Sequence, residues 1–105
     1  MSYIVLDLEW NQAMSSNASV FNRLPIHLSG EIIQIGAVKL DDDFCPAEEF
    51  QSDVRPIYFR SMHYKVKKLT GIDKERLSHG DTYPTVFEHF REWCGEDPVF
   101  VTWGY

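Results

Sequence analysis

The sequence predicts an α/β fold with a mixed sheet, in which a three-strand meander is followed by a helical crossover and a further parallel strand. Apolar, β-rich runs at residues 3–9, 31–40 and 49–54 alternate with polar stretches, as consecutive strands do. Residues 61–94 then take on helical character, and residues 98–105 return to a buried-type strand pattern. A strand that returns after a helical crossover pairs parallel to an earlier strand, through a right-handed connection.

Turn-forming residues separate the predicted strands. Residues 11–22 are rich in Ser and Asn and lack periodicity, which indicates a long loop of the kind that often carries function. Gly30 opens the second strand, and the acidic run at residues 41–43 is typical of a solvated hairpin turn. Calcium binding is the alternative for that run, but the Gly and the distal Glu of a calcium loop are missing. Pro56 ends the third strand, because proline cannot donate to a sheet ladder.

Two short helical segments are predicted after the meander. Residues 61–69 form a helix that stops at Gly71, where a left-handed backbone is expected. Asp73 caps a short turn that runs through Leu77.

A third helix is predicted before the last strand. Thr85 and Glu88 form a capping-box pair at its start, and Gly95 ends it. Apolar residues repeat along it at helical spacing and predict its buried side: Val86, Phe87, Phe90, Trp93 and Cys94.

Composition restricts the class of protein. A chain of 105 residues forms one domain, and its net charge of −6 argues against nonspecific binding of polyanions by the whole surface. Seven of the ten basic residues nevertheless lie between Arg55 and Arg76. Such a run is either a solvated helical face or an edge that contacts phosphates.

The expected compartment is the cytoplasm. No apolar stretch approaches the roughly 20 residues that span a bilayer, so no membrane partner is expected. The first ten residues lack the pattern of a secretory signal. Cys45 and Cys94 have no metal-ligand spacing and are interpreted as reduced thiols, with Cys94 on the apolar side of its helix.

The first predicted strand ends in two carboxylates, Asp7 and Glu9. Residues two apart in a strand point to the same face, so the two acids project together. Like charges side by side are unfavourable unless a cation compensates them, and oxygen ligands suit Mg²⁺ or Mn²⁺. The simpler alternative is that the strand ends here and both acids are solvated.

An ordered set of segments resembles the N-terminal part of a DEDD-type 3′–5′ exonuclease of the ribonuclease T and DNA polymerase III epsilon superfamily. Within it, the chain most resembles the ERI-1-like group. The matching pieces are Asp7-Leu8-Glu9, the strand at residues 31–38, Val54-Arg55-Pro56, Leu69-Thr70-Gly71-Ile72 and the helix at residues 84–93. The resemblance implies a ribonuclease H-like fold, with residues 1–105 as a single exonuclease domain that is incomplete at its C-terminal end.

The resemblance also implies the roles of individual residues. Asp7 and Glu9 would be metal ligands in a site that holds two Mg²⁺ or Mn²⁺ ions when complete, clamping the attacking and leaving oxygens about 4 Å apart. Leu8 and Trp10 would lie near the terminal nucleotide, where Trp10 either stacks on a base or serves as a buried structural residue. Many relatives have Thr where this chain has Asn11, which would contact the substrate end. The remaining substrate contacts predicted are phosphate contacts by Lys65 and Lys68.

The later ligands of the family pattern are not found within the sequence. The resemblance places an Asp just after a strand like residues 100–103, and a His and another Asp further on. None of the four histidines has an Asp four or five residues later. The chain is therefore expected to be nearly inactive alone.

Three functions are compared on this basis. The first is a metal-dependent 3′–5′ exonuclease whose partners are 3′ ends of single-stranded RNA or DNA. The second is a noncatalytic module that binds nucleic acid through the basic segment or a protein through the final strand edge, where self-association is possible. The third is a phosphatase with Asp7 as nucleophile, ranked last because Glu9 stands where such enzymes usually have a second Asp.

Overall fold

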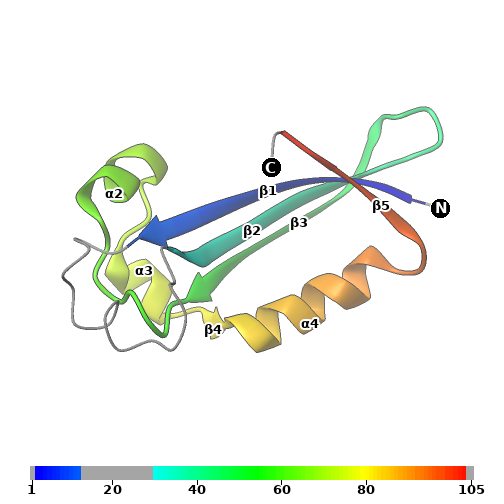
Figure 1. Cartoon of the computed structure of the whole chain (residues 1–105). Helices are drawn as coiled ribbons and strands as arrows, with labels where there is room; N and C mark the ends of the chain where they lie inside the picture. Colours follow the sequence, from blue (N-terminus) through cyan, green and yellow to red (C-terminus); the bar gives the residue numbers. More distant parts are fainter. Residues whose placement is uncertain (1, 13–29, 104–105) are drawn as a thin grey trace.

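A computed structural model describes residues 2–12 and 30–103 as a mixed five-stranded sheet with three helices (Figure 1). The sheet order is β4-β3-β2-β1-β5, with β1–β2 and β2–β3 antiparallel and with β5 parallel to β1. The strands are β1 (Ser2–Gln12), β2 (Gly30–Leu40), β3 (Pro46–Arg55), β4 (Asp81–Thr82) and β5 (Pro98–Thr102). The helices are α2 (Tyr64–Thr70), α3 (Lys74–Ser78) and α4 (Tyr83–Cys94). The predicted α/β meander and parallel return strand are confirmed; the two-residue strand β4 was not predicted.

The hairpin between β2 and β3 forms at the predicted acidic turn. Residues 41–43 are exposed, and the Asp41 carboxylate accepts the backbone N–H groups of Asp43 at 2.9 Å and Cys45 at 3.0 Å. Such bonds from a side chain to the following backbone stabilise tight turns. Most of the predicted loop at residues 11–22 lies outside the described residues, and its first two residues belong to β1.

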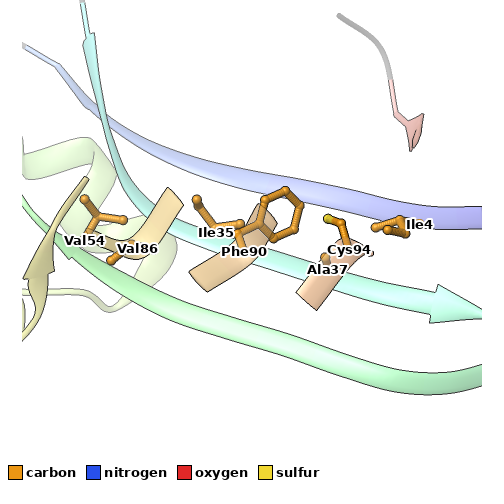
Figure 2. Close-up of a cluster of buried hydrophobic side chains, with 7 residues drawn as sticks. All are labelled: Ile4, Ile35, Ala37, Val54, Val86, Phe90 and Cys94. Atoms are coloured by element: carbon orange, nitrogen blue, oxygen red, sulfur yellow. The ribbon is translucent and has the colours of Figure 1, made fainter. Parts of the chain in front are cut away.

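Helix α4 covers one face of the sheet (Figure 1). In Figure 2, Val86, Phe90 and Cys94 follow one another along α4 and point at sheet residues. All seven side chains of this cluster are buried: Ile4, Ile35, Ala37, Val54, Val86, Phe90 and Cys94. The helical spacing thus identified three buried positions of α4.

Two predictions for α4 were wrong. The helix begins at Tyr83 with Thr82 as its N-cap, so Thr85 lies inside the first turn and forms no capping box. Pro84, which is favoured in the first turn of a helix, accounts for this earlier beginning. Glu88 pairs instead with Arg91, and the hydrogen bond from Arg91 lowers the pKa of Glu88. Phe87, predicted to be buried, is 42% exposed.

Helices α2 and α3 close the end of the sheet opposite the β2–β3 hairpin (Figure 1). They enclose a second buried cluster of Ile33, Ile72 and Leu77. Helix α2 begins later than predicted because His63, whose Nδ1 accepts the Lys65 N–H at 3.2 Å, is its N-cap. The predicted left-handed stop at Gly71 is confirmed by its φ of 74°. Asp73 is the predicted N-cap of α3 and accepts the Arg76 N–H at 2.8 Å.

Strand β5 lies at the edge of the sheet, beside β1 (Figure 1). The sequence pattern predicted a buried strand, yet Val99, Phe100 and Val101 are 37%, 48% and 44% exposed. The correction has a simple cause, because in the described part of the chain β5 has a neighbouring strand on one side only. None of the described helices is both long and apolar enough to span a bilayer.

Candidate functional site

Asp7 and Glu9 lie on the face of the sheet that α4 does not cover. Leu6 and Leu8 alternate with them and pack against the cluster beneath α4. Because neighbouring residues of a strand point to opposite faces, the two acids project from the other side. Asp7 is exposed and Glu9 is partly buried, so both carboxylates are accessible to solvent and to a cation.

A β-bulge lies directly beside Glu9. Glu9 is opposite Gln34 and Trp10 is opposite Ile32, which leaves Ile33 as an extra residue in β2. Ile33 is fully buried in the cluster formed with α2 and α3. The bulge therefore anchors β2 to the helical end of the molecule next to one of the two acids.

A row of polar side chains crosses the sheet from Glu9. Glu9 is opposite Gln34, and Gln34 is opposite Asp53 on β3. Gln34 Nε2 donates to Asp53 Oδ1 at 3.1 Å. Arg76 of α3 donates from Nε to Asp53 Oδ2 at 2.7 Å and from Nη2 to Oδ1 at 3.0 Å, and this hydrogen bonding and charge raise the pKa of Arg76. Asp53 is thus committed to Arg76, whereas Asp7 and Glu9 pair with no cation in the described residues.

Gly36 leaves open space beside Asp7. It is directly opposite Asp7 in the sheet, so a side chain there would project onto the same face. A Cβ atom at Gly36 would meet only the Asp7 backbone oxygen, at 3.5 Å, within 4 Å. Among the described residues, no side chain therefore fills the position beside Asp7 at Gly36.

The donor set fits a hard divalent cation in part. Two carboxylates on one face are suitable ligands for Mg²⁺ or Mn²⁺, which prefer oxygen. Among residues 2–12 and 30–103 there is no group of three or more His, Cys, Asp or Glu side chains that could hold a metal. Asp7 and Glu9 can consequently supply only part of a coordination shell.

The other residues predicted at the site do not gather around Asp7 and Glu9. Leu8 packs on the α4 side of the sheet, and Trp10 lies on that side with half of its surface exposed. Trp10 is therefore not the buried structural residue that was the alternative to base stacking. Lys65 and Lys68 are exposed on α2, where Lys65 lies over the Tyr64 ring.

Asn11 is buried and has a packing role in place of the predicted substrate contact. Its Nδ2 donates to the carbonyl oxygens of Phe59 at 2.8 Å and Ser61 at 3.0 Å. Its Oδ1 accepts the His63 N–H at 2.9 Å. The side chain is 0% exposed, so it fastens the end of β1 to the segment before α2 and presents no atom to a ligand.

Sequence reasoning missed the role of Glu31. Its carboxylate accepts three consecutive backbone N–H groups, from Ile57 at 2.8 Å, Tyr58 at 3.0 Å and Phe59 at 2.9 Å. These bonds hold the segment that follows β3 against β2. A polar residue at the start of an apolar strand was the only signal, and it does not identify a partner 26 residues away.

Several solved structures share this fold. The nuclease domain of 3′hExo, a DEDDh family member solved with rAMP, has a TM-score of 0.77 and 22% identity, covering 98% of this chain and 52% of that chain. Cell-death related nuclease 4 has a TM-score of 0.74 and 23% identity, covering 96% and 34%. Exonuclease X, solved with 5′ overhanging duplex DNA, has a TM-score of 0.61 and 14% identity, covering 95% and 47%. The chain thus spans about half, or less, of these solved chains.

The comparison at the sequence level identifies the family. No curated protein matches the chain. Residues 4–104, however, match the RNase_T family model, which is described as an exonuclease. That match covers nearly the whole chain and agrees with the predicted ribonuclease T superfamily, and the solved structures share the fold. The chain therefore belongs to the RNase T family of exonucleases.

Proposed function

We propose that the protein is a metal-dependent 3′–5′ exonuclease acting on the 3′ ends of single-stranded RNA or DNA, with Asp7 and Glu9 as two of its metal ligands. The observation that carries this proposal is the pair of acids on one sheet face, with Asp7 exposed and Glu9 partly buried, beside Gly36, which has no side chain. In the described residues neither acid has a cationic partner, and such a pair is favourable when a cation compensates it.

The residues around the acids have supporting roles. A bound Mg²⁺ or Mn²⁺ would lower the pKa of a coordinated water and stabilise charge on the phosphate being cleaved. The bulge beside Glu9 and the three hydrogen bonds of Asn11 hold the end of β1 in place. Solved neighbours named for nucleic-acid ligands, such as the DNA complex of exonuclease X, support nucleic acid as the substrate class.

The proposal is tested with a 5′-labelled single-stranded oligonucleotide and Mn²⁺. The natural gene product that contains residues 1–105 is expected to shorten the strand one nucleotide at a time from its 3′ end. Asp7→Asn and Glu9→Gln should each abolish this shortening, because each removes a ligand charge without changing the side-chain shape. The 105-residue chain, assayed alongside, should be much slower, since two carboxylates hold a divalent cation weakly.

Asp42→Asn is the matched control. It removes the same charge from an exposed position in the β2–β3 hairpin, at the other end of the meander, so activity should be unchanged. Shortening that persists in Asp7→Asn, or that starts from the 5′ end, would contradict the proposal. Strand binding without any shortening would favour the noncatalytic module instead.

A further inference from the structure

A pocket lined by cationic side chains lies where β3 ends. Its volume is about 400 Å³, within the range of small-ligand sites. Arg55, Arg60 and Lys74 line it together with the hydroxyl residues Ser78 and Thr82, and none of the described carboxylates lines it. Arg55 comes two residues after Asp53, where the polar row from Glu9 ends. By strand spacing, β3 lies about 10 Å from β1.

The three cations of this pocket are unpaired in the part of the chain that the structure describes. The ion pairs there use Lys39, Arg76 and Arg91. Arg76 belongs to the same basic stretch of sequence as the pocket residues, but Asp53 already neutralises it. Three positive charges around one hollow are unfavourable without an anion, so the pocket is suited to a phosphate group.

Hydrogen bonds to Glu31 hold the wall of the pocket in place. The Glu31 carboxylate accepts the backbone N–H groups of residues 57–59, between Arg55 and Arg60. Asn11 fixes the same segment slightly further on, through the carbonyl oxygens of Phe59 and Ser61. The segment therefore keeps its shape without a ligand, which lowers the entropic cost of binding one.

An aromatic pocket adjoins the cationic one. It has a volume of about 330 Å³, and Ile57 lines both pockets. Its walls include Trp10, Tyr58 and Tyr83, which are 50%, 43% and 39% exposed. Exposed aromatic faces beside unpaired cations are the combination that binds single-stranded nucleic acid, because bases stack on the rings while cations contact phosphates.

We propose that these adjoining pockets form a binding site for a single nucleic-acid strand, with a backbone phosphate held by Arg55, Arg60 and Lys74 and a base placed against Trp10, Tyr58 and Tyr83. The site is separate from the acidic pair, because Trp10 lies on the opposite side of β1 from Glu9. The inference relies on the proposed function for the class of its ligand. The inference adds a second binding site for the nucleic-acid strand, away from the end that is cleaved.

The cationic half is tested by fluorescence anisotropy with the full 105-residue chain and fluorescein-labelled oligouridine, in EDTA and at several salt concentrations. Arg60→Gln and Lys74→Gln should each weaken binding about tenfold, as expected for one charge-assisted contact. In a plot of the logarithm of the binding constant against the logarithm of the salt concentration, each should also make the slope shallower by about 0.7, as expected for one lost phosphate contact. Lys74→Arg, which keeps the positive charge, should bind oligouridine about as tightly as the unmutated chain.

Lys67→Gln is the matched control for charge. Lys67 is exposed on α2 in the same basic stretch and lines neither pocket, so its loss should leave the salt slope unchanged. An equal effect of all three Gln variants would overturn the pocket in favour of diffuse attraction. Binding of pyrophosphate without binding of oligouridine would likewise overturn the strand site.

The aromatic half has its own pair of variants. Tyr58→Leu keeps an apolar side chain but removes the ring, and should weaken oligouridine binding at least about fivefold. Phe44→Leu makes a similar change at an exposed ring in the β2–β3 hairpin, and should have no effect. Thermal unfolding by circular dichroism verifies that each variant is folded. Equal binding by Tyr58→Leu and the unmutated chain would overturn the base contact.

The two proposals can fail separately. Binding in EDTA needs neither metal nor cleavage, so it reports on the pockets even if Asp7 and Glu9 have no nuclease role. Conversely, loss of 3′ shortening in Asp7→Asn supports the nuclease whatever the pocket variants show.

Discussion

Asn11 shows how one side chain can decide the position of a whole segment. Its amide makes three hydrogen bonds to backbone groups at residues 59, 61 and 63, about 50 positions further along the chain. We expect Asn11→Ala to destabilise the chain by about 1–3 kcal/mol or more, because buried backbone groups lose their partners. Urea denaturation measures the change. Gln12→Ala, at the exposed neighbouring position, should be near neutral, and equal losses for both would contradict this role.

Burial makes the Cys94 thiol a source of pH dependence. Desolvation raises the pKa of Cys94 above its ordinary value of 9.0, an effect that the nearby Lys39 charge partly opposes. As pH rises past 9, the unfolded chain releases this proton first, so unfolding becomes easier until the folded-state pKa is reached. The free energy of unfolding should therefore fall between pH 8 and pH 10 more steeply in the unmutated chain than in Cys94→Ala.

Cys45→Ala is the control for this pH effect. Cys45 is exposed in the β2–β3 turn, so its removal should leave the alkaline loss of stability in place. The same two thiols should differ in reactivity: a disulfide reagent at neutral pH is expected to modify Cys45 quickly and Cys94 only after unfolding. Two equally fast thiols would rule out the buried position of Cys94.

The candidate site was predictable at the residue scale only in part. Asp7 and Glu9 share a face because strand periodicity is a local property, readable from the sequence. The contacts of Asn11 and Glu31 span 26 or more residues, and no local pattern specifies such partners. Leu8, between the two acids, was predicted at the nucleotide but lies on the other face, as the same periodicity requires.

At the scale of elements, α4 shows which buried positions helical spacing predicts correctly and which it does not. Phe87 and Phe90 both match the apolar repeat, yet Phe90 is 6% exposed and Phe87 is 42% exposed. Phe90 contacts Phe50 and Trp93 with ring centroids 5.4 Å and 6.1 Å apart. The apolar residues of α4 therefore occupy a wider part of the helix surface than the part that packs against the three-strand meander.

This difference gives a paired prediction. Phe90→Ala should destabilise the chain by about 3–5 kcal/mol, because it removes a buried ring and leaves a cavity. Phe87→Ala should lower stability far less, since its ring mainly stacks on Tyr83 at the surface. Chemical denaturation of both variants measures the gap, and similar losses would mean that α4 is rotated relative to the arrangement described.

The accuracy with which helix ends were predicted depended on the kind of sequence signal at each end. Gly71 and Asp73 were predicted correctly because a left-handed stop and an N-cap are each defined by one residue and its immediate neighbours. The capping box at Thr85 and Glu88 was wrong because Pro84 permits an earlier start, and a single sequence does not rank the two signals.

At the scale of the whole molecule, the edge strand β5 exposes three consecutive apolar residues. Val99, Phe100 and Val101 are all more than one-third exposed. In the described residues its outer backbone groups meet no further strand, and such edges tend to pair with other chains. We therefore expect the 105-residue chain to self-associate at high concentration.

Val101→Lys tests this expectation, because a charge on an exposed edge strand opposes pairing. Sedimentation velocity should show that the variant remains monomeric at concentrations where the unmutated chain associates. Phe44→Lys, an equally charged change at an exposed position of the β2–β3 turn and not on β5 itself, should not reduce association. An unmutated chain that stays monomeric throughout would contradict the role of this edge.

Local patterns in the sequence are enough to predict the order of the three helices and of every strand except β4, the parallel return of the last strand, and the placement of Asp7 and Glu9 on one face. The first and last of these follow from hydrophobic periodicity and single-residue caps, which are local, whereas the parallel return follows from a general rule for strands joined by a helical crossover. The burial of Asn11, the hydrogen bonds from residues 57–59 to Glu31 and the gathering of Arg55, Arg60 and Lys74 around one pocket are visible only in the folded chain. Those arrangements form because packing brings residues that are distant in sequence close together in space. Local sequence patterns do not specify such partners.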